Sequence, residues 1–258
     1  MLFNAKMNIV PESVVIIPTY NEIENIEDII NKVFSLSVFF HVLIIDDNSP
    51  DGTANVVKKM MANGNENRLF ILEREGKLGL GTAYIAGFKW AIENNYQFVF
   101  EMDADFSHNP DDLVRLHHAC SVKNYDVAIG SRYISGANVV NWPLKRVLLS
   151  YYASRYVDII TGMKIRDATA GFICYKIEVL KTIELDKIRF KGYAFQIEMK
   201  FMSWLYEFKI IEVPIIFTDR TRGVSKMSKK IIKEAFWGVI QMKMSSLFKT
   251  YERPSSGK

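Results

Sequence analysis

The chain has 258 residues, of which 49% are hydrophobic and 24% are charged, and its formal net charge is +4. This composition provides the core of one large α/β domain and excludes a disordered or fibrous chain. A charge of +4 is too small to indicate a nucleic-acid partner, and we expect none. The two cysteines, Cys120 and Cys174, form neither a disulfide framework nor a metal-ligand spacing, so we expect buried, reduced thiols.

The longest apolar stretch, residues 33–45, contains Ser35, Ser37 and His41 and ends on two aspartates. It is well short of the ~20 residues that a membrane span needs. Residues 1–10 also lack the sustained apolar core of a signal peptide. We therefore expect a soluble or peripheral protein with no transmembrane helix.

Apolar runs alternate with helical periodicities through the first half of the chain. This alternation is typical of βαβ units, so we predict an α/β fold with a mainly parallel central sheet and helices on both faces. The expected strands are residues 14–17, 42–45, 68–72, 98–102, 127–129 and 210–217, the last interrupted at Pro214.

The first helix should be capped by Asn21, because Glu24 three residues later completes a capping-box pattern. Its apolar stripe would comprise Ile23, Ile26, Ile29, Ile30, Val33 and Phe34. The second helix would turn Val56, Val57, Met60 and Met61 inward. The third would begin after a glycine-rich turn and run through Ala91.

The glycine-rich turn contains Gly76, Gly79 and Gly81, but its spacing matches neither a P-loop nor G-x-G-x-x-G. We interpret it as a tight strand-to-helix connection, with Lys77 as a candidate phosphate contact. His117 and His118 diverge on a helix and do not predict a zinc site. His108 is better placed to support Asp105.

Residues 18–22, Pro-Thr-Tyr-Asn-Glu, follow the first strand, where an open α/β sheet places its ligand-binding groups. Tyr20 could lie against a base and Glu22 could accept a hydrogen bond from it. The alternative is a helix cap with a packed tyrosine. The next such turn begins Asp46-Asp47, two adjacent carboxylates that a turn does not need. One could bind a ribose or base, although Asp51-Gly52 would also serve simply to start a helix.

Two carboxylates, Asp103 and Asp105, come directly after the apolar run of residues 98–100. A strand that ends in Asp-x-Asp directs two hard oxygen ligands into the crevice at the carboxyl edge of the sheet. Such ligands suit a divalent cation and the diphosphate that the cation would neutralise. The alternative is an ordinary strand-to-loop turn, since aspartate and asparagine are common turn residues.

Basic residues recur beside small or aromatic ones in the second half of the chain. The three clusters are residues 130–133, residues 142–146 with Ser150, and residues 219–226. Arginine pairs bidentately with phosphate oxygens, so these clusters could serve two phosphorylated substrates. Solvated surface charge is the alternative. Residues 229–248 are apolar at helical spacing with interspersed lysines, which suits either a helix on an anionic membrane or a helix covering the protein.

Taken together, these motifs resemble those of the dolichyl/polyprenyl-phosphate mannosyltransferases of glycosyltransferase family two, from about Val14 to Lys226. The matching segments are IIPTYNE, IIDDNSPDGT, GLGTAYIAGFKWA, MDADFSHNP, GSRY, NWPLKR, RDATAGF, GYAFQIE and EVPIIFTDRTRGVSK. Asp-x-Asp alone is common, but the ordered set is specific. The last five segments are similar to the polyprenyl-phosphate branch in particular.

The resemblance implies a GT-A (Rossmann-like) nucleotide-sugar fold in residues 1–226. The residues beyond it predict an amphipathic helical extension in 227–250 and a disordered tail in 251–258. The resemblance further implies inverting transfer of mannose from GDP-mannose to a polyprenyl or dolichyl phosphate, on the cytoplasmic face of a membrane. A membrane-anchoring partner or an oligomer remains open. The alternatives are a UDP-sugar-dependent transferase of the same fold and a non-catalytic nucleotide-sugar-binding subunit.

The resemblance also implies roles for individual residues. The nucleoside side would comprise Pro18, Tyr20, Glu22, Ile45 and Asp47. Asp103, Ala104 and Asp105 would surround the diphosphate, with Asp103, Asp105 and Ser107 near Mg²⁺ or Mn²⁺. Arg132, Arg220 and Lys226 would contact donor phosphates, and Arg146 and Ser150 the lipid phosphate. The catalytic set would be Asp103, Asp105, Arg132 and Arg220, while Gln196 and Glu198 belong to an acceptor-side segment.

Three positions depart from the family pattern. Ser107 stands where some relatives have glutamine, so its metal contact could pass through water. Ala170 replaces a frequent serine, and Tyr151 follows Ser150 where relatives often have arginine. The sequence contains no candidate Ser/His or Cys/His pair. A lipid phosphate needs none, because its second pKa near 6 makes it mostly a dianion at neutral pH.

Overall fold

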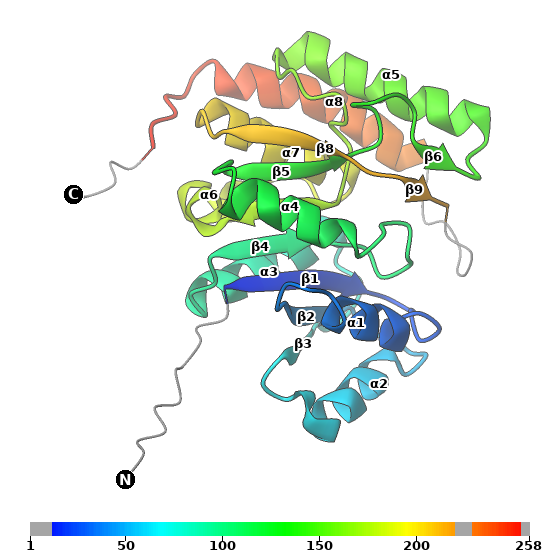
Figure 1. Cartoon of the computed structure of the whole chain (residues 1–258). Coiled ribbons are helices and arrows are strands. Elements are labelled where there is room, and N and C mark those ends of the chain that lie inside the picture. Colours follow the sequence, from blue (N-terminus) through cyan, green and yellow to red (C-terminus); the bar gives the residue numbers. More distant parts are fainter. Residues whose placement is uncertain (1–11, 220–228, 254–258) are drawn as a thin grey trace.

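The computed structural model describes residues 12–219 and 229–253 of the chain. A seven-stranded sheet in the order β3-β2-β1-β4-β7-β5-β8 forms its centre (Figure 1). The strands of this sheet are β1 (Ser13–Thr19), β2 (His41–Asp46), β3 (Leu69–Glu73), β4 (Phe98–Glu101), β5 (Val127–Ser131), β7 (Ile173–Lys176) and β8 (Ile210–Pro214). All run parallel except β7, which pairs antiparallel with both β4 and β5. The predicted mainly parallel sheet is confirmed.

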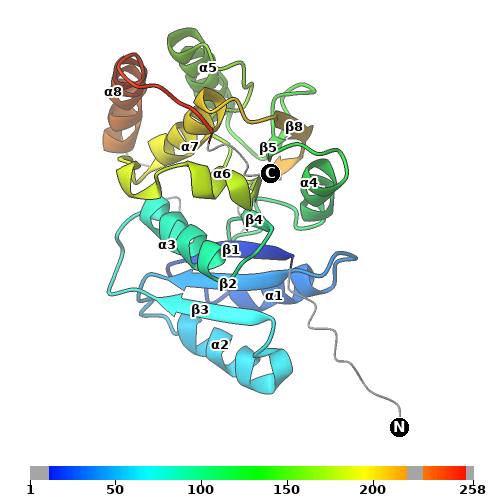
Figure 2. The same ribbon diagram turned by 90° about the vertical axis from the view of Figure 1, so that its left-hand side faces the viewer.

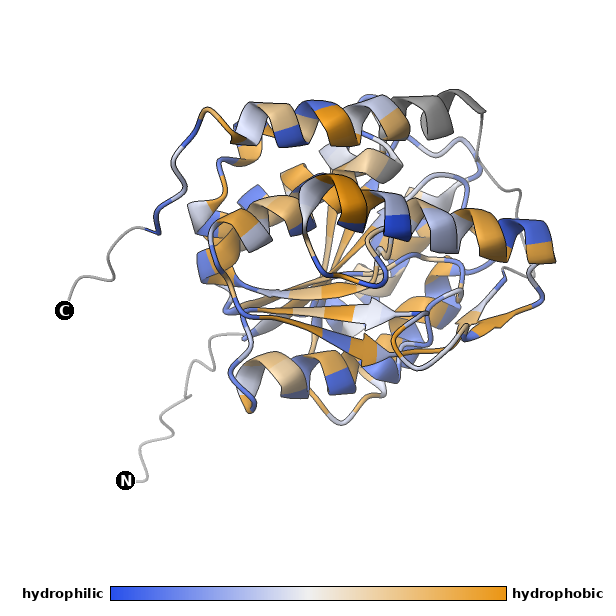
Figure 3. Cartoon of the chain, turned by 90° about the horizontal axis from the view of Figure 1, so that it is seen from above, coloured by the Kyte–Doolittle hydropathy of each residue, from blue (hydrophilic) through white to orange (hydrophobic). Residues whose placement is uncertain are grey.

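Helices cover both faces of the sheet (Figures 1 and 2). They are α1 (Ile26–Phe34), α2 (Thr53–Met60), α3 (Leu80–Glu93), α4 (Asp112–Ser121), α5 (Leu144–Thr161), α6 (Ile177–Thr182), α7 (Tyr193–Leu205) and α8 (Lys229–Ser246). A π-helical turn η1 (Met61–Asn65) follows α2, and a 3₁₀ turn η2 (Leu185–Lys187) follows α6. Figure 3 shows hydrophobic and hydrophilic residues alternating along the outer helices.

Two apolar cores lie on opposite faces of the sheet because successive side chains of a strand point to opposite sides. In β1, Val14 and Ile16 pack in the core beneath α3, α6 and α7. Val15 and Ile17 pack in the core beneath α1, α2 and α4. The inner strands are buried on both faces, which explains their continuous apolar runs.

Helix α8 packs on α5 and α7, and its own Val239 and Met242 are buried in this contact. Its outer side exposes Trp237, and Leu247 and Phe248 are exposed just beyond its end. The helix therefore covers part of the protein and still offers apolar side chains to its surroundings. No helix in the described ranges is long and apolar enough to span a bilayer. Cys120 and Cys174 are buried and free, as expected.

The predicted start of the first helix was wrong. Helix α1 begins at Ile26 after Asn25, whereas Asn21 adopts a φ of 57° and Ile23 is exposed outside the helix. Residues 21–23 are instead bound to the following βα turn. The Asn21 N–H donates to Ser49 Oγ, and the Glu22 N–H donates to Thr53 Oγ1, each at 3.0 Å. These long-range hydrogen bonds replace the local capping box.

The strands in the second half of the chain differ from the prediction. The strand expected over residues 210–217 ends at Pro214, as its proline indicated, and a separate short strand β9 (Phe217–Thr218) follows. β9 pairs with β6 (Val139–Val140) beside the main sheet. Neither β6 nor the antiparallel β7 was predicted.

Close packing requires a glycine at position 81 of the glycine-rich turn. A Cβ on Gly81 would lie 2.8 Å from both the Phe190 carbonyl oxygen and the Phe195 ring. We expect Gly81→Ala to lower the free energy of unfolding by about 1–3 kcal/mol through overpacking. Urea denaturation measures this change. Gly76→Ala is the control, because a Cβ there meets nothing within 4 Å; equal stability of the two variants would contradict the interpretation.

Candidate functional site

The loops that follow β1, β2, β4 and β5 meet at one edge of the sheet because these strands are parallel. In Figure 1 this edge lies toward the right, where the arrowheads of β1 and β5 point. Within the described ranges, nearly all the site residues predicted from the sequence lie at the ends of these strands, in these loops or in α5. The fold therefore brings the separate motifs to one side of the molecule.

The adjacent carboxylates after β2 have different surroundings. Asp46 is 1% exposed, and its carboxylate accepts hydrogen bonds from Thr19 Oγ1 at 2.8 Å and from the Ser49 N–H at 2.9 Å. It joins the first two βα turns. Asp47 accepts from Arg74 Nε at 2.6 Å, and Arg74 also reaches Thr82 Oγ1 at 2.8 Å. Asp46 is therefore structural, while Asp47 and Arg74 form a charged pair at the edge.

The other nucleoside-side candidates lie around this pair. Lys77 Nζ is 4.7 Å from the centre of the Tyr20 ring, which brings the glycine-rich turn over the first βα turn. The Glu22 carboxylate accepts from Asn25 Nδ2 at 3.2 Å. Pro18 is half-buried, and the Ile45 side chain is fully buried in the core. The whole Ile45 residue is 0% exposed, so it lies beneath the site rather than at its surface.

The acidic loop after β4 places its two aspartates differently. The Asp103 side chain is 39% exposed, whereas Asp105 is 8% exposed and its Oδ1 accepts from the Ser107 N–H at 3.0 Å. Ser107 and Ala104 are both buried. Asp105 borders a cavity of about 430 Å³ whose other walls are Lys32, Phe106, Asn109, Pro110, Thr218 and Asp219. The loop thus presents one buried, oriented carboxylate and one more accessible one.

His108 supports this loop as an uncharged ring. It is 3% exposed and stacks on Phe172 at 4.8 Å between ring centres. Burial lowers the pKa of His108 to about 4, although Asp105 acts in the opposite direction. Nδ1 is then able to accept a hydrogen bond from the Asp103 N–H, at 3.4 Å. The ring therefore helps to orient the backbone that carries the acidic pair.

A divalent cation fits the donor chemistry of this loop. Within the described ranges, no group of three or more His, Cys, Asp or Glu residues could hold a metal ion. Mg²⁺ is commonly held by only one or two protein carboxylates, with substrate phosphates and water as its other ligands. Asp103 and Asp105 supply hard oxygens of that kind, so the residues present fit such an ion.

Arg132, at the end of β5, is held by a carboxylate that sequence reasoning did not single out. Asp167 accepts from Arg132 Nε at 2.7 Å and from Nη2 at 2.6 Å, and also from the Arg132 backbone N–H at 2.9 Å. Asp167 is completely buried. Burial alone would raise the pKa of Asp167, but Arg132 outweighs it and the pKa is lowered. This bidentate pair fixes the guanidinium at the edge of the sheet.

Arg146, in the first turn of α5, lies near the same place. It donates to Asp219 at 2.9 Å, and its guanidinium carbon is 4.0 Å from the centre of the Trp142 ring. The guanidinium carbon of Arg132 lies 5.3 Å from the same centre. The two basic clusters thus converge on one indole. Ser150 is half-buried one turn further along α5, while Arg220 and Lys226 lie outside the described residues.

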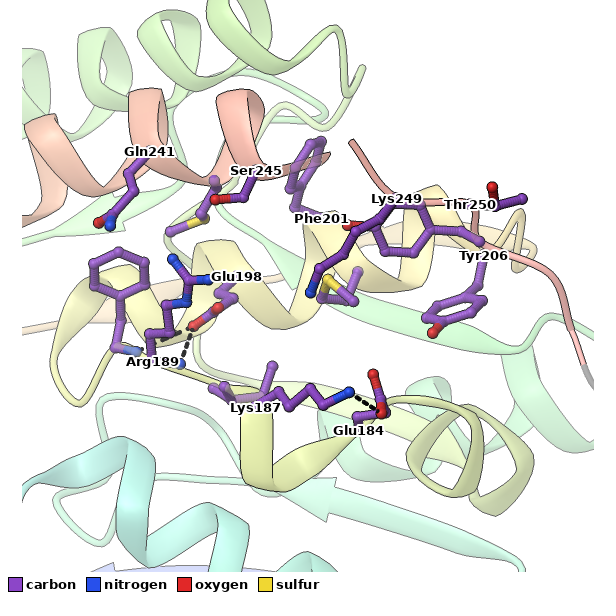
Figure 4. Close-up of a pocket in the computed structure, with 15 residues that line it drawn as sticks. Glu184, Lys187, Arg189, Glu198, Phe201, Tyr206, Gln241, Ser245, Lys249 and Thr250 are labelled. Carbon is purple, nitrogen blue, oxygen red and sulfur yellow. Dashed lines mark hydrogen bonds and ion pairs between the residues drawn. The ribbon is translucent and has the colours of Figure 1, made fainter. Parts of the chain in front are cut away.

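The two acceptor-side candidates on α7 make structural hydrogen bonds. The Glu198 carboxylate accepts from the backbone N–H groups of Arg189 and Phe190, at 2.9 and 3.1 Å. Glu198 also borders a second cavity, of about 440 Å³, between η2, α7 and the end of α8 (Figure 4). Gln196 is buried and donates to Glu101.

Glu101 and Lys200 are ionisable residues in the core behind the acidic loop, and both are completely buried. Lys200 Nζ donates to the carbonyl oxygens of Ala168 at 3.1 Å, Ala170 at 2.6 Å and Gln196 at 3.1 Å. Burial raises the pKa of Glu101 and lowers that of Lys200, and each charge partly offsets the burial of the other. The pair links the strand before Asp103 to the loop that contains Asp167.

Known proteins of similar sequence identify the family of this chain. Residues 14–184 match the profile of Glycosyl transferase family 2. The chain belongs to this family. Within it, the polyprenol monophosphomannose synthase of Mycolicibacterium smegmatis is 44% identical over 229 residues, covering 89% of this chain and 86% of that protein. The undecaprenyl-phosphate mannosyltransferase of Micrococcus luteus is 42% identical over 229 residues, covering 87% and 93%. The resemblance drawn from the motifs is confirmed.

Solved structures support the GT-A fold of this family 2 member. Mannosyltransferase PcManGT from Pyrobaculum calidifontis, in complex with GDP-Man and Mn²⁺, superposes with a TM-score of 0.55 at 15% identity, covering 92% of this chain and 74% of that one. TarS from S. aureus, in complex with UDP-GlcNAc, gives a TM-score of 0.62 at 19% identity, covering 93% and 67%. At these identities the likeness concerns the fold.

Glu101 and Lys200 are buried together, so removal of Lys200 should destabilise the fold. We expect Lys200→Met to lower the free energy of unfolding by about 3 kcal/mol or more, because it leaves three buried carbonyl oxygens without their donor. Adding Glu101→Leu should recover part of that loss, since the buried carboxyl whose burial Lys200 partly offsets is then also absent. Urea denaturation of the two single variants and the double variant measures the coupling. Additive losses would contradict it.

Proposed function

We propose that this protein transfers a mannosyl group from GDP-mannose to the phosphate of a polyprenyl lipid, with inversion at the anomeric carbon. Two relatives at 42% and 44% identity, which the chain covers almost entirely, are named as mannosyl transferases or synthases acting with polyprenol or undecaprenyl phosphate. The observation that carries the proposal is the meeting of an acidic loop and two arginines at one sheet edge.

The proposed donor site comprises the loops after β1, β2 and β4. Pro18, Tyr20, Glu22, Ile45 and Asp47 would hold the nucleoside, and Asp103, Ala104 and Asp105 would surround the diphosphate. Arg132, with Arg220 and Lys226, would contact the donor phosphates. Arg146 and Ser150 would bind the lipid phosphate. Arginine suits both tasks because its planar guanidinium matches phosphate oxygens.

Mg²⁺ or Mn²⁺, bound by Asp103 and Asp105 with Ser107 nearby, would neutralise charge that develops on the departing diphosphate. The hard oxygens of the acidic loop support this part of the proposal. A solved structure of similar fold is described as a complex with GDP-Man and Mn²⁺. Asp105 is already oriented for the task by the Ser107 N–H. Little reorganisation of its carboxylate is then needed when the donor binds.

In the proposed reaction, an oxygen of the lipid phosphate forms a bond to the anomeric carbon. The bond from that carbon to the diphosphate oxygen breaks, and GDP leaves with the electron pair. The attacking group is already ionised, because its second pKa lies near 6. No side chain has to remove a proton. The arginines instead hold two anions near each other that would otherwise repel, and they orient the attack.

The identity of the donor base distinguishes GDP-mannose from a UDP-sugar. The solved structures of similar fold are described with GDP-Man in one case and UDP-GlcNAc in another, so the fold is compatible with either base. The names of the two relatives favour a mannosyl donor. Calorimetry with GDP and UDP separates the alternatives, and tighter binding of UDP would replace GDP-mannose by a UDP-sugar.

We expect Asp105→Asn to reduce mannosyl transfer by at least about 100-fold, because the variant loses the oriented charge beside the leaving diphosphate. The assay follows radiolabelled GDP-mannose with a short polyprenyl phosphate and Mg²⁺, and thermal unfolding checks that the fold is intact. Asp186→Asn is the control, since the Asp186 side chain is 83% exposed and pairs only with Lys89 in the described residues. Substantial metal-dependent transfer by Asp105→Asn would refute the assignment.

Peripheral membrane binding completes the proposal. Helix α5 exposes an apolar row at i, i+4, i+8 and i+15, consisting of Leu144, Leu148, Tyr152 and Ile159. Exposed apolar patches of this kind mark interaction sites, and a lipid substrate identifies the bilayer as the partner. Lys145 and Arg155 lie on the same helix and suit anionic headgroups. Arg146 lies in the first turn of the same helix and contacts Trp142 and Asp219, so docking of this helix would bring the site close to the membrane.

We expect the double variant Tyr152→Ser/Ile159→Ser to bind vesicles containing phosphatidylglycerol at least about tenfold more weakly, because two apolar side chains no longer enter the interface. Cosedimentation measures the partition. Val122→Ser is the control, because Val122 is 68% exposed but follows α4 on the other face of the sheet. Equal binding by both variants would place the membrane contact elsewhere.

A further inference from the structure

Trp142 occupies the position where the two basic clusters of the site converge. Its ring centre lies 4.0 Å from the guanidinium carbon of Arg146 and 5.3 Å from that of Arg132. The Phe217 ring packs edge-on against it, with 5.2 Å between ring centres. Trp142 is half-buried, and within the described residues its buried Nε1 has no hydrogen-bond partner. One side chain therefore connects groups from β5, β9 and α5.

The contacts of the two arginines are unequal. Arg132 is fixed by the bidentate bond to Asp167, by Thr169 and by its own backbone N–H, so its position does not depend on the indole. Within the described residues Arg146 has one ion pair, with Asp219, and its side chain is 27% exposed. The indole face at 4.0 Å is its other close contact. Trp142 therefore restricts Arg146 more than Arg132.

We propose that Trp142 is a positioning residue, which fixes the separation between the arginine on the donor side and the arginine on the acceptor side. The inference rests on the proposed function, in which Arg132 and Arg146 contact different phosphates. The indole attracts each cation to its negative π face and excludes water from the space beside them. It also holds two like charges near one ring, while Asp167 and Asp219 balance them.

This spacing matters because the attacking oxygen must lie about 3–3.5 Å from the anomeric carbon in a reactive complex. The phosphates bound by the two arginines set where that oxygen and the leaving diphosphate lie. A guanidinium that moves freely would still bind lipid phosphate, but it would hold the phosphate in a wider range of positions. Loss of the indole should therefore affect both the acceptor KM and kcat, with a smaller effect on the donor KM.

The test measures steady-state transfer with farnesyl phosphate as acceptor and GDP-mannose as donor. We expect Trp142→Leu to raise the farnesyl phosphate KM and lower kcat, by about tenfold or more in their ratio. Trp142→Phe, which keeps a smaller π face, should lie between wild type and Trp142→Leu. The donor KM should change less. The control is Trp204→Leu on α7, because Trp204 stacks on Phe201 and contacts neither arginine in the described structure.

A double-mutant cycle separates this role from simple packing. In an Arg146→Gln background the guanidinium that depends on the indole is absent, while Arg132 is still fixed by Asp167. Trp142→Leu should then cause little further loss in kcat/KM for farnesyl phosphate. A residue that only supports the fold would cause the same fractional loss in both backgrounds. Equal losses, or an unchanged acceptor KM in Trp142→Leu, would overturn the inference.

Binding measured without donor distinguishes failure of the inference from failure of the proposed function. Farnesyl phosphate should change the tryptophan fluorescence of the wild-type protein, and Trp142→Phe should remove most of that change. If the wild type binds farnesyl phosphate and Trp142→Leu binds it equally well, only the role of Trp142 is refuted. If the wild type does not bind farnesyl phosphate at all, the proposed acceptor is refuted and the inference with it.

Discussion

The buried ion pair of Arg132 and Asp167 is the interaction on which the site depends. It joins the end of β5 to the loop before β7, and β7 lies between β4 and β5 in the sheet. The same loop receives the ammonium of Lys200 on two carbonyl oxygens and the Glu212 carboxylate on the N–H groups of Arg166 and Asp167. Because these buried polar groups satisfy one another, the guanidinium has one arrangement at the sheet edge.

Local sequence pattern identified the strands that are buried on both faces, because such strands are continuous apolar runs. It did not identify β7, a four-residue strand whose antiparallel place depends on partners distant in sequence. The capping box at Asn21 failed for a related reason. Ser49 and Thr53, some thirty residues away, hold this segment outside the helix. In both cases tertiary hydrogen bonding decided the structure where the local preference was weak.

The candidate site was likewise only partly predictable from the sequence. Asp103 and Asp105 were recognisable because they directly follow a buried strand and belong to an ordered set of motifs. The sequence could not distinguish Asp46 from Asp47, since only the folded chain brings Thr19 and Ser49 to one of them. In the sequence, Asp167 is a single acidic residue in a short loop, which only weakly indicates a site residue. Its importance follows from the arginine that it meets 35 residues away in sequence.

In the proposed function, helix α5 would connect the site to the membrane in one rigid element. It begins immediately after Trp142 and Pro143, its first turn carries Arg146, and its outward face bears the exposed apolar row. A helix N-terminus also has a partial positive charge, which adds to the attraction of Arg146 for an anion. If the apolar row enters the headgroup region, the first turn lies at the depth where lipid phosphates are found. The same 18-residue helix would then bring the acceptor to the edge of the sheet proposed to bind the donor.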